Sequence, residues 1–285
     1  MRKPLVLAAA VLLAAAVTPA FAGFSLSLRL AGGPGYLALK DANTVLKDWE
    51  TWQIKQVESN KKYVLEEDKV GSFHGAVDFD AELILGFGRH FALGVSAGAL
   101  HASLSEKSAF VTVAKPAGTY TYAHSMTASA FPVIVSGYGM LPLSAKLTLY
   151  VKAGAGLIWG KIVEREASKL KTSETYSYPA YQSAASRGKI LAAGAGLSFA
   201  VDDSLSFFLE ASGRKAELTD FDGEAKGSFK GALYSFEQYD IKLKYWQRRF
   251  EVMEHSPQGA IFRNQVKAKI DFSGFSAKLG LALKF

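Results

Sequence analysis

The sequence predicts an all-β fold, an eight-stranded antiparallel up-and-down barrel that spans a membrane. Three observations predict it. The chain begins with a segment typical of exported proteins, the remainder alternates apolar and polar residues, and the connections between alternating segments are short and long in turn. Among 285 residues there is no cysteine, which excludes disulfide frameworks and cysteine-ligated metal sites, and the formal net charge is +7.

Residues 1–22 have the features of a signal peptide. Two basic residues precede an apolar run from Leu5 to Val17, and a proline then leads to Ala20-Phe21-Ala22, where a signal peptidase reads small residues. The run is too short to cross about 30 Å of hydrocarbon as a helix. We therefore expect cleavage after Ala22, leaving residues 23–285 as one barrel domain in the outer membrane of a Gram-negative-type bacterium.

Period-two alternation recurs along the mature chain, most clearly at its C-terminus. Phe275, Leu279 and Phe285 share one face there, and Lys278 and Lys284 lie on the other. The same pattern in seven further segments predicts eight strands. The eight segments are Phe24–Ala31, Asp78–Phe87, Phe91–Ala99, Phe131–Tyr138, Leu147–Trp159, Leu191–Val201, Leu205–Ala211 and Phe275–Phe285.

The connections predict the orientation of these strands. Three are short, and the other four span roughly 40–72, 105–119, 164–188 and 219–266. Short turns on one rim and long loops on the other are typical of outer-membrane barrels, with the loops outside the cell. A ten-stranded alternative stays open, because Phe229–Phe236 and Tyr239–Phe250 can form a hairpin about Glu237-Gln238 that joins the wall.

The distribution of charge favours a membrane barrel over a soluble one. A soluble barrel would turn its apolar faces inward, whereas here one face is apolar throughout and the other carries charges at mid-strand. Six of these charges fall at similar depth. They are Arg29, Asp80, Glu82, Lys152, Glu210 and Lys278.

These six residues are expected to form a lumen charge network. Buried charges persist only when they are paired, so Arg29 is expected to meet Asp80 or Glu82, and Lys278 to meet Glu210. The network would plug the lumen rather than conduct or catalyse. Inward glycines also predict a small cavity above the charges, unless Tyr138, Tyr150, Ile158 and Phe208 fill it. The glycines are Gly94, Gly98, Gly154, Gly156, Gly194 and Gly196.

The chain resembles the small outer-membrane barrels of the OmpX, OmpA and OmpW type. The resemblance rests on the ending from Ser273 to Phe285, which is similar to a terminal aromatic assembly signal, and on the glycine-rich strand from Tyr150 to Gly156. It implies recognition by the barrel assembly machinery and periplasmic chaperones, contact with outer-membrane lipid and lipopolysaccharide-type glycolipid, and a monomer. The signal residues would be Phe275, Leu279, Leu281, Leu283 and Phe285.

Two long loops carry candidate binding residues. In the first, apolar residues recur at helical spacing over Thr44–Val57, which predicts a helix capped by Asn43 or Thr44. Its residues Trp49 and Trp52 are expected to pack against neighbouring loops rather than against lipid or a partner. The last loop carries cations that either contact glycolipid phosphates or form a solvated face. These are Lys242, Lys244, Arg248 and Arg249.

Motifs for catalysis or metal binding are incomplete. The five histidines lack metal-binding spacings, Ser125 beside His124 has no assignable acid, and Asp220–Glu224 is only a fragment of a calcium loop. We expect no enzyme, cofactor, metal or nucleic acid. The expected role is structural or surface-interacting, through long extracellular loops. The alternative is a narrow channel or binding barrel for small, possibly apolar solutes. An enzyme would require a histidine–carboxylate cluster at one rim.

Overall fold

The computed structural model describes residues 24–172, 177–225 and 229–285, and the structural statements below concern these residues. The expected signal peptide, residues 1–22, lies outside them. Within the described ranges, no helix is both long and apolar enough to cross a membrane.

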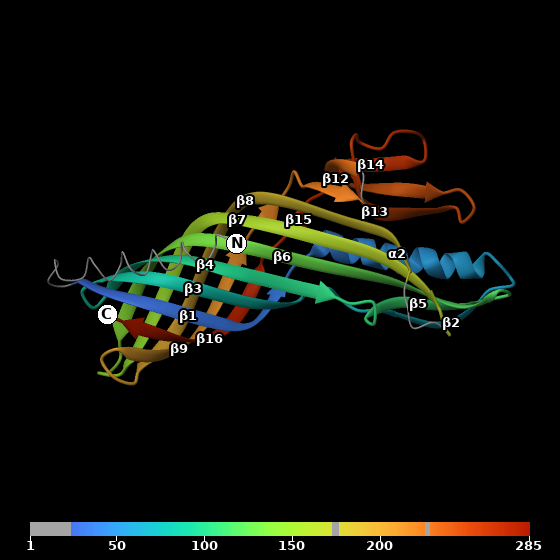
Figure 1. The fold of residues 1–285 in the computed structure, drawn as a ribbon. Helices are drawn as coiled ribbons and strands as arrows, with labels where there is room; N and C mark the ends of the chain where they lie inside the picture. Colours follow the sequence, from blue (N-terminus) through green and yellow to red (C-terminus); the bar gives the residue numbers. More distant parts are fainter. Residues whose placement is uncertain (1–23, 173–176, 226–228) are drawn as a thin grey trace.

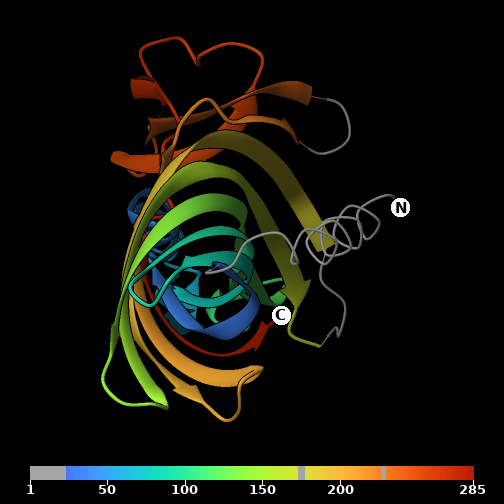
Figure 2. The same ribbon diagram turned by 90° about the vertical axis from the view of Figure 1, so that its left-hand side faces the viewer.

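Eight strands pair antiparallel in a closed ring, which Figure 2 shows end-on. Pairing of the first and last strands, from Ser27 opposite Lys284 to Leu37 opposite Gly274, closes it. Each of the eight expected segments corresponds to one ring strand, to within one residue at its end. In ring order these are β1 (Phe24–Leu37), β3 (Gly75–Phe87), β4 (Phe91–Leu104), β6 (Gly118–Pro142), β7 (Leu147–Leu170), β8 (Ser177–Ala200), β9 (Leu205–Lys215) and β16 (Gly274–Lys284).

Three ring strands are much longer than the sequence pattern indicated. β6, β7 and β8 have 25, 24 and 24 residues, and their ends project beyond the other ring strands (Figure 1). Two short strands, β5 (Ala109–Lys115) and β2 (Val64–Val70), extend this projecting sheet beside β6. Segments expected to be loops are therefore largely sheet.

A helix, α2 (Lys40–Glu58), packs on the projecting sheet (Figure 1). It covers the expected Thr44–Val57 but begins earlier, and neither expected residue caps it. Leu39 occupies the N-cap position in the left-handed conformation, without a side-chain cap. The Asn43 side chain instead donates to the carbonyls of Leu39 and Phe73 and accepts from the Phe73 N–H, which ties the helix to the chain before β3.

The last long connection folds into a small sheet outside the ring. Its strands are β11 (Asp222–Ala225), β12 (Phe229–Asp240), β13 (Tyr245–Met253) and β14 (Phe262–Lys267). β11 pairs with β8, whereas β12 and β13 form the expected hairpin without entering the ring, so the ring itself keeps eight strands. The hairpin turns at residues 241–244 rather than at Glu237-Gln238. We call α2, β2, β5, β11–β14 and the projecting ends of β6–β8 the cap.

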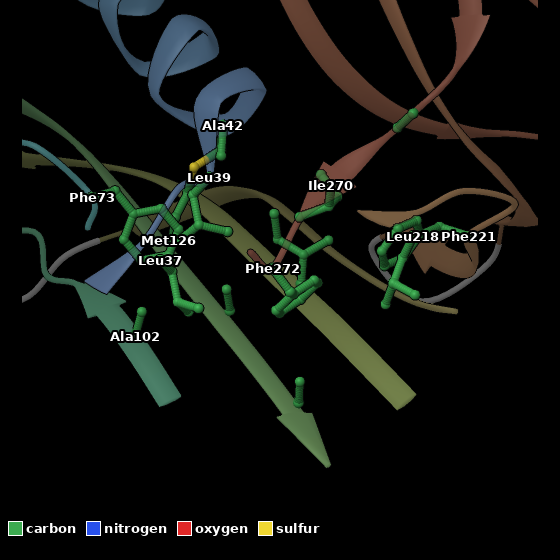
Figure 3. Close-up of a cluster of buried hydrophobic side chains, with 14 of the residues drawn as sticks. Leu37, Leu39, Ala42, Phe73, Ala102, Met126, Leu218, Phe221, Ile270 and Phe272 are labelled. Carbon is green, nitrogen blue, oxygen red and sulfur yellow. The ribbon is translucent and has the colours of Figure 1, made fainter. Parts of the chain in front are cut away.

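A buried apolar core fills the ring where it meets the cap (Figure 3). The short strands β10 (Glu217–Leu218) and β15 (Ile270–Asp271) pair with each other there. Leu218 packs close to Gly160 of β7 and Gly188 of β8, where a larger residue would clash. The core therefore continues from the ring wall to the base of α2.

Candidate functional site: the ring interior and the cap

The outer face of the ring is apolar. Every ring strand exposes large apolar side chains, such as Phe91, 68% exposed on β4, and Leu279, 69% exposed on β16. The outward stretch from Leu191 to Val201, along and just beyond β8, rises about 25 Å at 3.3 Å per residue and a tilt near 40°. Because inward side chains of the same strands carry buried charges, the polarity is the inverse of a soluble barrel.

Six inward residues form what we call the first network: Arg29, Glu82, Tyr138, Tyr150, Lys152 and Glu210. Lys152 Nζ lies 2.9 Å from Glu210 Oε1 and 3.4 Å from Glu82 Oε2. Arg29 Nη2 lies 3.7 Å from Glu210 Oε2. These contacts join strands on different sides of the ring, so the network crosses the lumen.

Two tyrosines connect the charges of the first network. Arg29 donates hydrogen bonds to the hydroxyls of Tyr138, at 3.2 Å, and of Tyr150. Tyr138 in turn donates to Glu82, and Tyr150 donates to Glu210 at 3.1 Å. The Arg29 guanidinium also lies 3.6 Å from the centre of the Phe208 ring, a favourable cation–π position. The sequence analysis omitted these tyrosines from the network, although inward alternation on β6 and β7 was the available signal.

The predicted cavity above the charges is absent from the described lumen, so that hypothesis is wrong. Tyr138, Tyr150 and Phe208 pack together and are 4–5% exposed, and Ile158 is fully buried. The inward glycines leave room for these groups rather than for a ligand. A side chain at Gly196 would clash with the Tyr150 hydroxyl.

Asp78, Asp80, Arg214 and Lys278 form the second network. Arg214 Nη1 lies 2.8 Å from Asp78 Oδ2, and Lys278 Nζ lies 3.2 Å from Asp78 Oδ1 while also donating to Asp80. Their side chains are between 4% and 14% exposed, which is deep enough for pairing to matter. The sequence analysis left Asp78 and Arg214 out, although alternation places Asp78 on the same face as Asp80.

The pairing of the six predicted charges differs from the expectation in two ways. They divide between two networks instead of forming one layer. Lys278 contacts Asp78 and Asp80 although its backbone partner across the strand pair is Glu210. Arg29 reaches Glu82 only through Tyr138, because its guanidinium is directed toward Glu210 and Tyr150.

An apolar layer separates these networks from the cap. The layer includes Leu37, Phe73 and Met126, at the left in Figure 3, and Leu218 and Phe272, at the right. All five are at most 1% exposed. The described lumen is thus filled by ion pairs, aromatic rings and apolar side chains in succession.

The cap is held by specific contacts with α2. Trp49 is 2% exposed, and the Trp52 indole N–H donates to Asp240 Oδ2 at 3.0 Å, across to β12. The Arg248 backbone N–H donates to Asp48 at 3.0 Å. The expectation that both tryptophans pack against neighbouring loops is confirmed.

The four cations predicted to contact glycolipid occupy different environments. Lys242 and Lys244 are exposed in the β12–β13 turn. Arg248 lies 3.3 Å from Glu237 Oε1, and Arg249 donates to Gln238 at 3.1 Å. In Figure 1 the hairpin of β12 and β13 lies beyond the ring, above α2. The two lysines make no ion pair or side-chain hydrogen bond among the described residues.

A second group of cations borders the apolar face directly, which the sequence analysis missed. We call Lys161, Arg187, Lys189 and Lys215 the basic stripe. All four are exposed, and none makes an ion pair within the described ranges. Lys161 lies opposite Ala185, and Lys215 opposite Leu191. Lys161 is therefore a diagonal neighbour of Arg187, and Lys215 of Lys189, at about 7–8 Å. Arg187 and Lys189 lie two residues apart on the same face of β8.

His124 lies at the inner surface of the cap, beside Glu164. The closest atoms of the two side chains are 2.8 Å apart. Burial disfavours the charged imidazolium, but the carboxylates of Glu164 and Glu166 outweigh it and raise the pKa of His124. Ser125 points elsewhere and donates to Glu106 at 3.1 Å, so His124 and Ser125 do not form a nucleophile–base pair here.

The five predicted assembly-signal residues all lie on the last strand, β16, or directly after it. Phe275, Leu279 and Phe285 are 63%, 69% and 60% exposed, and Leu283 is 38% exposed. Leu281 is half-buried. They share the apolar outward face of β16 and the residue after it, with Phe285 donating its N–H to the carbonyl of Leu26.

Comparison with known proteins yields distant likenesses only. No protein-family model matches the chain, and no curated protein does. Among solved structures the chain is similar to Ail, the attachment invasion locus protein of Yersinia pestis, determined with the heparin analogue sucrose octasulfate, at 11% identity over 92% of this chain and 99% of that chain, with a TM-score of 0.36. It is also similar to the RagAB peptide importer at 9% identity over 90% of this chain and 40% of that chain, with a TM-score of 0.19. Likenesses at this level do not indicate a function.

Proposed function

We propose that the chain is a non-enzymatic outer-membrane β-barrel that acts at the cell surface through its ordered cap. The signal peptide would be cleaved after Ala22, and the eight-stranded ring would span the membrane as a monomer. The apolar exterior about 25 Å high and the charged, paired interior support membrane insertion, because this polarity would be unfavourable in water. The short turns would face the periplasm, and the cap would face outward.

The observation that carries this proposal is the contrast between a filled lumen and an elaborate cap. Two ion networks and an apolar layer occupy the lumen, whereas three strands continue past the ring to support a docked helix and a four-stranded sheet. Such an extension is unnecessary for anchoring and provides a rigid platform for contacts. The narrow-channel alternative has less support, since ion pairs bridge the lumen.

Lipid contact is proposed at the basic stripe rather than at the hairpin cations. In the proposed orientation, Lys161, Arg187, Lys189 and Lys215 border the apolar belt at the level of outer-leaflet head groups, where phosphate attracts cations. Barrel assembly machinery and periplasmic chaperones would act on the outward residues of β16 during insertion. Nucleic acid is not among the proposed partners.

Orientation is tested by labelling single cysteines, which the cysteine-free chain permits. Lys242→Cys reports on the cap, and Asp203→Cys, in the β8–β9 turn, is the matched control. A membrane-impermeant maleimide added to intact cells is expected to label the first and not the second. Labelling of Asp203→Cys alone would reverse the orientation, and labelling of neither would argue against surface exposure of the cap.

Closure of the lumen is tested by conductance in a planar bilayer. We expect no discrete conductance from the refolded mature chain. An Arg29→Ala/Lys278→Ala variant is also expected to be silent, because the apolar layer around Leu218 and Phe272 remains. Steady conductance in the parent would favour the channel. Conductance in the variant alone would mean that the charges form the main barrier.

A further inference from the structure

The cap contains a partly open cavity of about 160 Å³ between α2, the projecting parts of β6–β8 and the β13 strand. Its lining brings His124 from β6, Glu164 and Glu166 from β7, and Trp49 from α2 together. His124 lies directly opposite Glu166 in the β6–β7 pairing, and Glu164 is two residues along on the same face. Local strand geometry therefore directs all three polar side chains into one space.

His124 lacks the hydrogen bonds that a buried histidine ordinarily makes. It is 1% exposed, and neither ring nitrogen has a hydrogen-bond partner among the described residues. Nε2 lies 2.8 Å from Glu164 Oε1, close enough for a bond but without its alignment. Trp49 packs edge-on against the imidazole with ring centres 5.2 Å apart. A buried imidazole whose Nδ1 atom has no partner among the described residues is costly unless something binds it.

The carboxylates keep oxygen atoms free for a ligand. Gln182 donates to Glu164 Oε2 at 2.6 Å, which fixes that group and leaves Oε1 facing His124. Within the described ranges, Glu166 makes no hydrogen bond or ion pair. Arg248 and Arg249 also line the cavity, but their guanidinium groups contact Glu237 and Gln238 on β12. Glu164 and Glu166 thus present negative charge to the imidazole, while both guanidinium groups are bound to β12.

We propose that His124, Glu164 and Glu166 bind a divalent transition-metal ion of the zinc class. One nitrogen and two carboxylate oxygens form a donor set that zinc accepts, with bonds of about 2.0–2.2 Å. The three donor atoms lie within 4.8 Å of one another. Tetrahedral coordination needs separations of about 3.4 Å, so side-chain shifts of about 1 Å complete the site. The cavity leaves room for water as a fourth ligand.

A metal in this position would connect the elements of the cap. Its ligands come from β6 and β7, Gln182 of β8 holds Glu164 in place, and Trp49 covers the imidazole from α2. The Gln182 side chain also donates to the Phe250 carbonyl and accepts from the Val252 N–H, both on β13. This second layer of contacts is the kind that orients metal ligands in proteins.

The test is calorimetric titration of Zn²⁺ alone into the full mature chain, refolded in detergent. We expect one ion per chain, saturating below 100 μM, and a weakening of at least about tenfold in Glu166→Gln and in His124→Phe. Glu251→Gln, which changes a carboxylate in the same cavity outside the cluster, is the matched control and should bind as the parent does. Co²⁺ should give a visible absorption band in the parent that is lost in His124→Phe.

Folding of each variant is checked by far-ultraviolet circular dichroism, so that a misfolded variant is not scored as a loss of binding. Glu166→Gln keeps the size of the side chain and therefore decides the question if His124→Phe fails to fold. Saturable binding that persists unchanged in Glu166→Gln would overturn the site, as would no saturable binding by the parent below 100 μM. Equal weakening in Glu251→Gln would show general attraction of cations to the cavity and would also overturn it.

Discussion

Lys152 and Glu82 belong to ring strands separated by two others, yet their charged atoms lie 3.4 Å apart in the lumen. Lys152 also reaches Glu210 at 2.9 Å, so one ammonium group bridges two carboxylates that are each 2% exposed, and Arg29 supplies the second positive charge. A contact of this kind is possible only because the ring is narrow enough for side chains from different walls to meet. Because these side chains meet inside the closed ring, they also fill its lumen.

Replacing Lys152 with methionine is expected to destabilise the ring strongly. The substitution preserves much of the packing volume but leaves Glu82 and Glu210 buried with less positive charge, and breaking a buried pair costs about 3–5 kcal/mol. Urea-induced unfolding in lipid vesicles, followed by tryptophan fluorescence, measures this cost. Lys189→Met, on the outer face, is the control and should change the unfolding free energy little. A loss below about 1 kcal/mol in Lys152→Met would contradict the bridging role.

Replacing Trp52 with phenylalanine is expected to loosen the hairpin without affecting the ring. The change removes the 3.0 Å hydrogen bond to Asp240, worth about 1 kcal/mol or somewhat more for a partly exposed charged acceptor. Hydrogen exchange of backbone amides in β12 and β13 should accelerate several-fold while exchange in β1 and β16 stays constant. Asp240→Asn leaves one acceptor oxygen for the Trp52 indole and the backbone N–H groups of Lys242 and Leu243, so it should also accelerate exchange in β12. Unchanged exchange in β12 would mean that this bond does not hold the hairpin.

Acid is expected to weaken the cap through Glu237. Burial acts to raise its pKa, but contacts with Arg263 and Arg248 outweigh burial and lower the pKa below 4.5. A group whose pKa is depressed on folding stabilises the fold above its unfolded value, and that contribution is lost as the pH falls through the folded value. The stabilisation is thus complete above about pH 4.5 and disappears below it.

The pH effect is measured by comparing the parent with Glu237→Gln. Urea unfolding of the cap should be easier in the variant at pH 6, and the difference should shrink as the pH falls to 3. Glu67→Gln, on exposed β2 and without an ion pair in the described part of the chain, is the control and should match the parent throughout. A difference that grows on acidification would reverse the assigned sign.

The ring was predictable from sequence because its strands follow a strict period-two pattern, with one apolar outward face and one inward face. Beyond the ring that pattern ends. On the projecting part of β7, beyond Lys161, polar residues such as Glu164 also occur on the buried face, which breaks the alternation. The extension was therefore interpreted as a loop. Strand position also did not determine which charges meet, because Lys278 reaches past its backbone neighbour Glu210 to Asp78.

The His124 cluster illustrates a second reason why part of the site could not be predicted from sequence. His124 and Glu166 are 42 positions apart in sequence and become neighbours only through the β6–β7 register. No short spacing motif encodes that register so far beyond the ring. Trp49 was expected to pack within the cap, but its contact with His124 depends on where α2 lies on the sheet. The lumen residues were easier to predict, because the depth of each one in the ring can be counted in residues along its strand from a short turn.

Neutralising two cations of the basic stripe is expected to weaken glycolipid binding specifically. Arg187 and Lys189 border the apolar belt, and each cation near a phosphate-bearing surface contributes about 1 kcal/mol, so Arg187→Gln/Lys189→Gln should weaken binding by roughly thirty-fold at low salt. Lys242→Gln/Lys244→Gln, at the hairpin turn, is the matched control. Binding of a lipopolysaccharide-type glycolipid to the detergent-purified protein, measured at two salt concentrations, separates the pairs, because phosphate contacts weaken with salt. If only the hairpin pair matters, glycolipid contacts the cap instead, and the position of the stripe beside the belt has another cause.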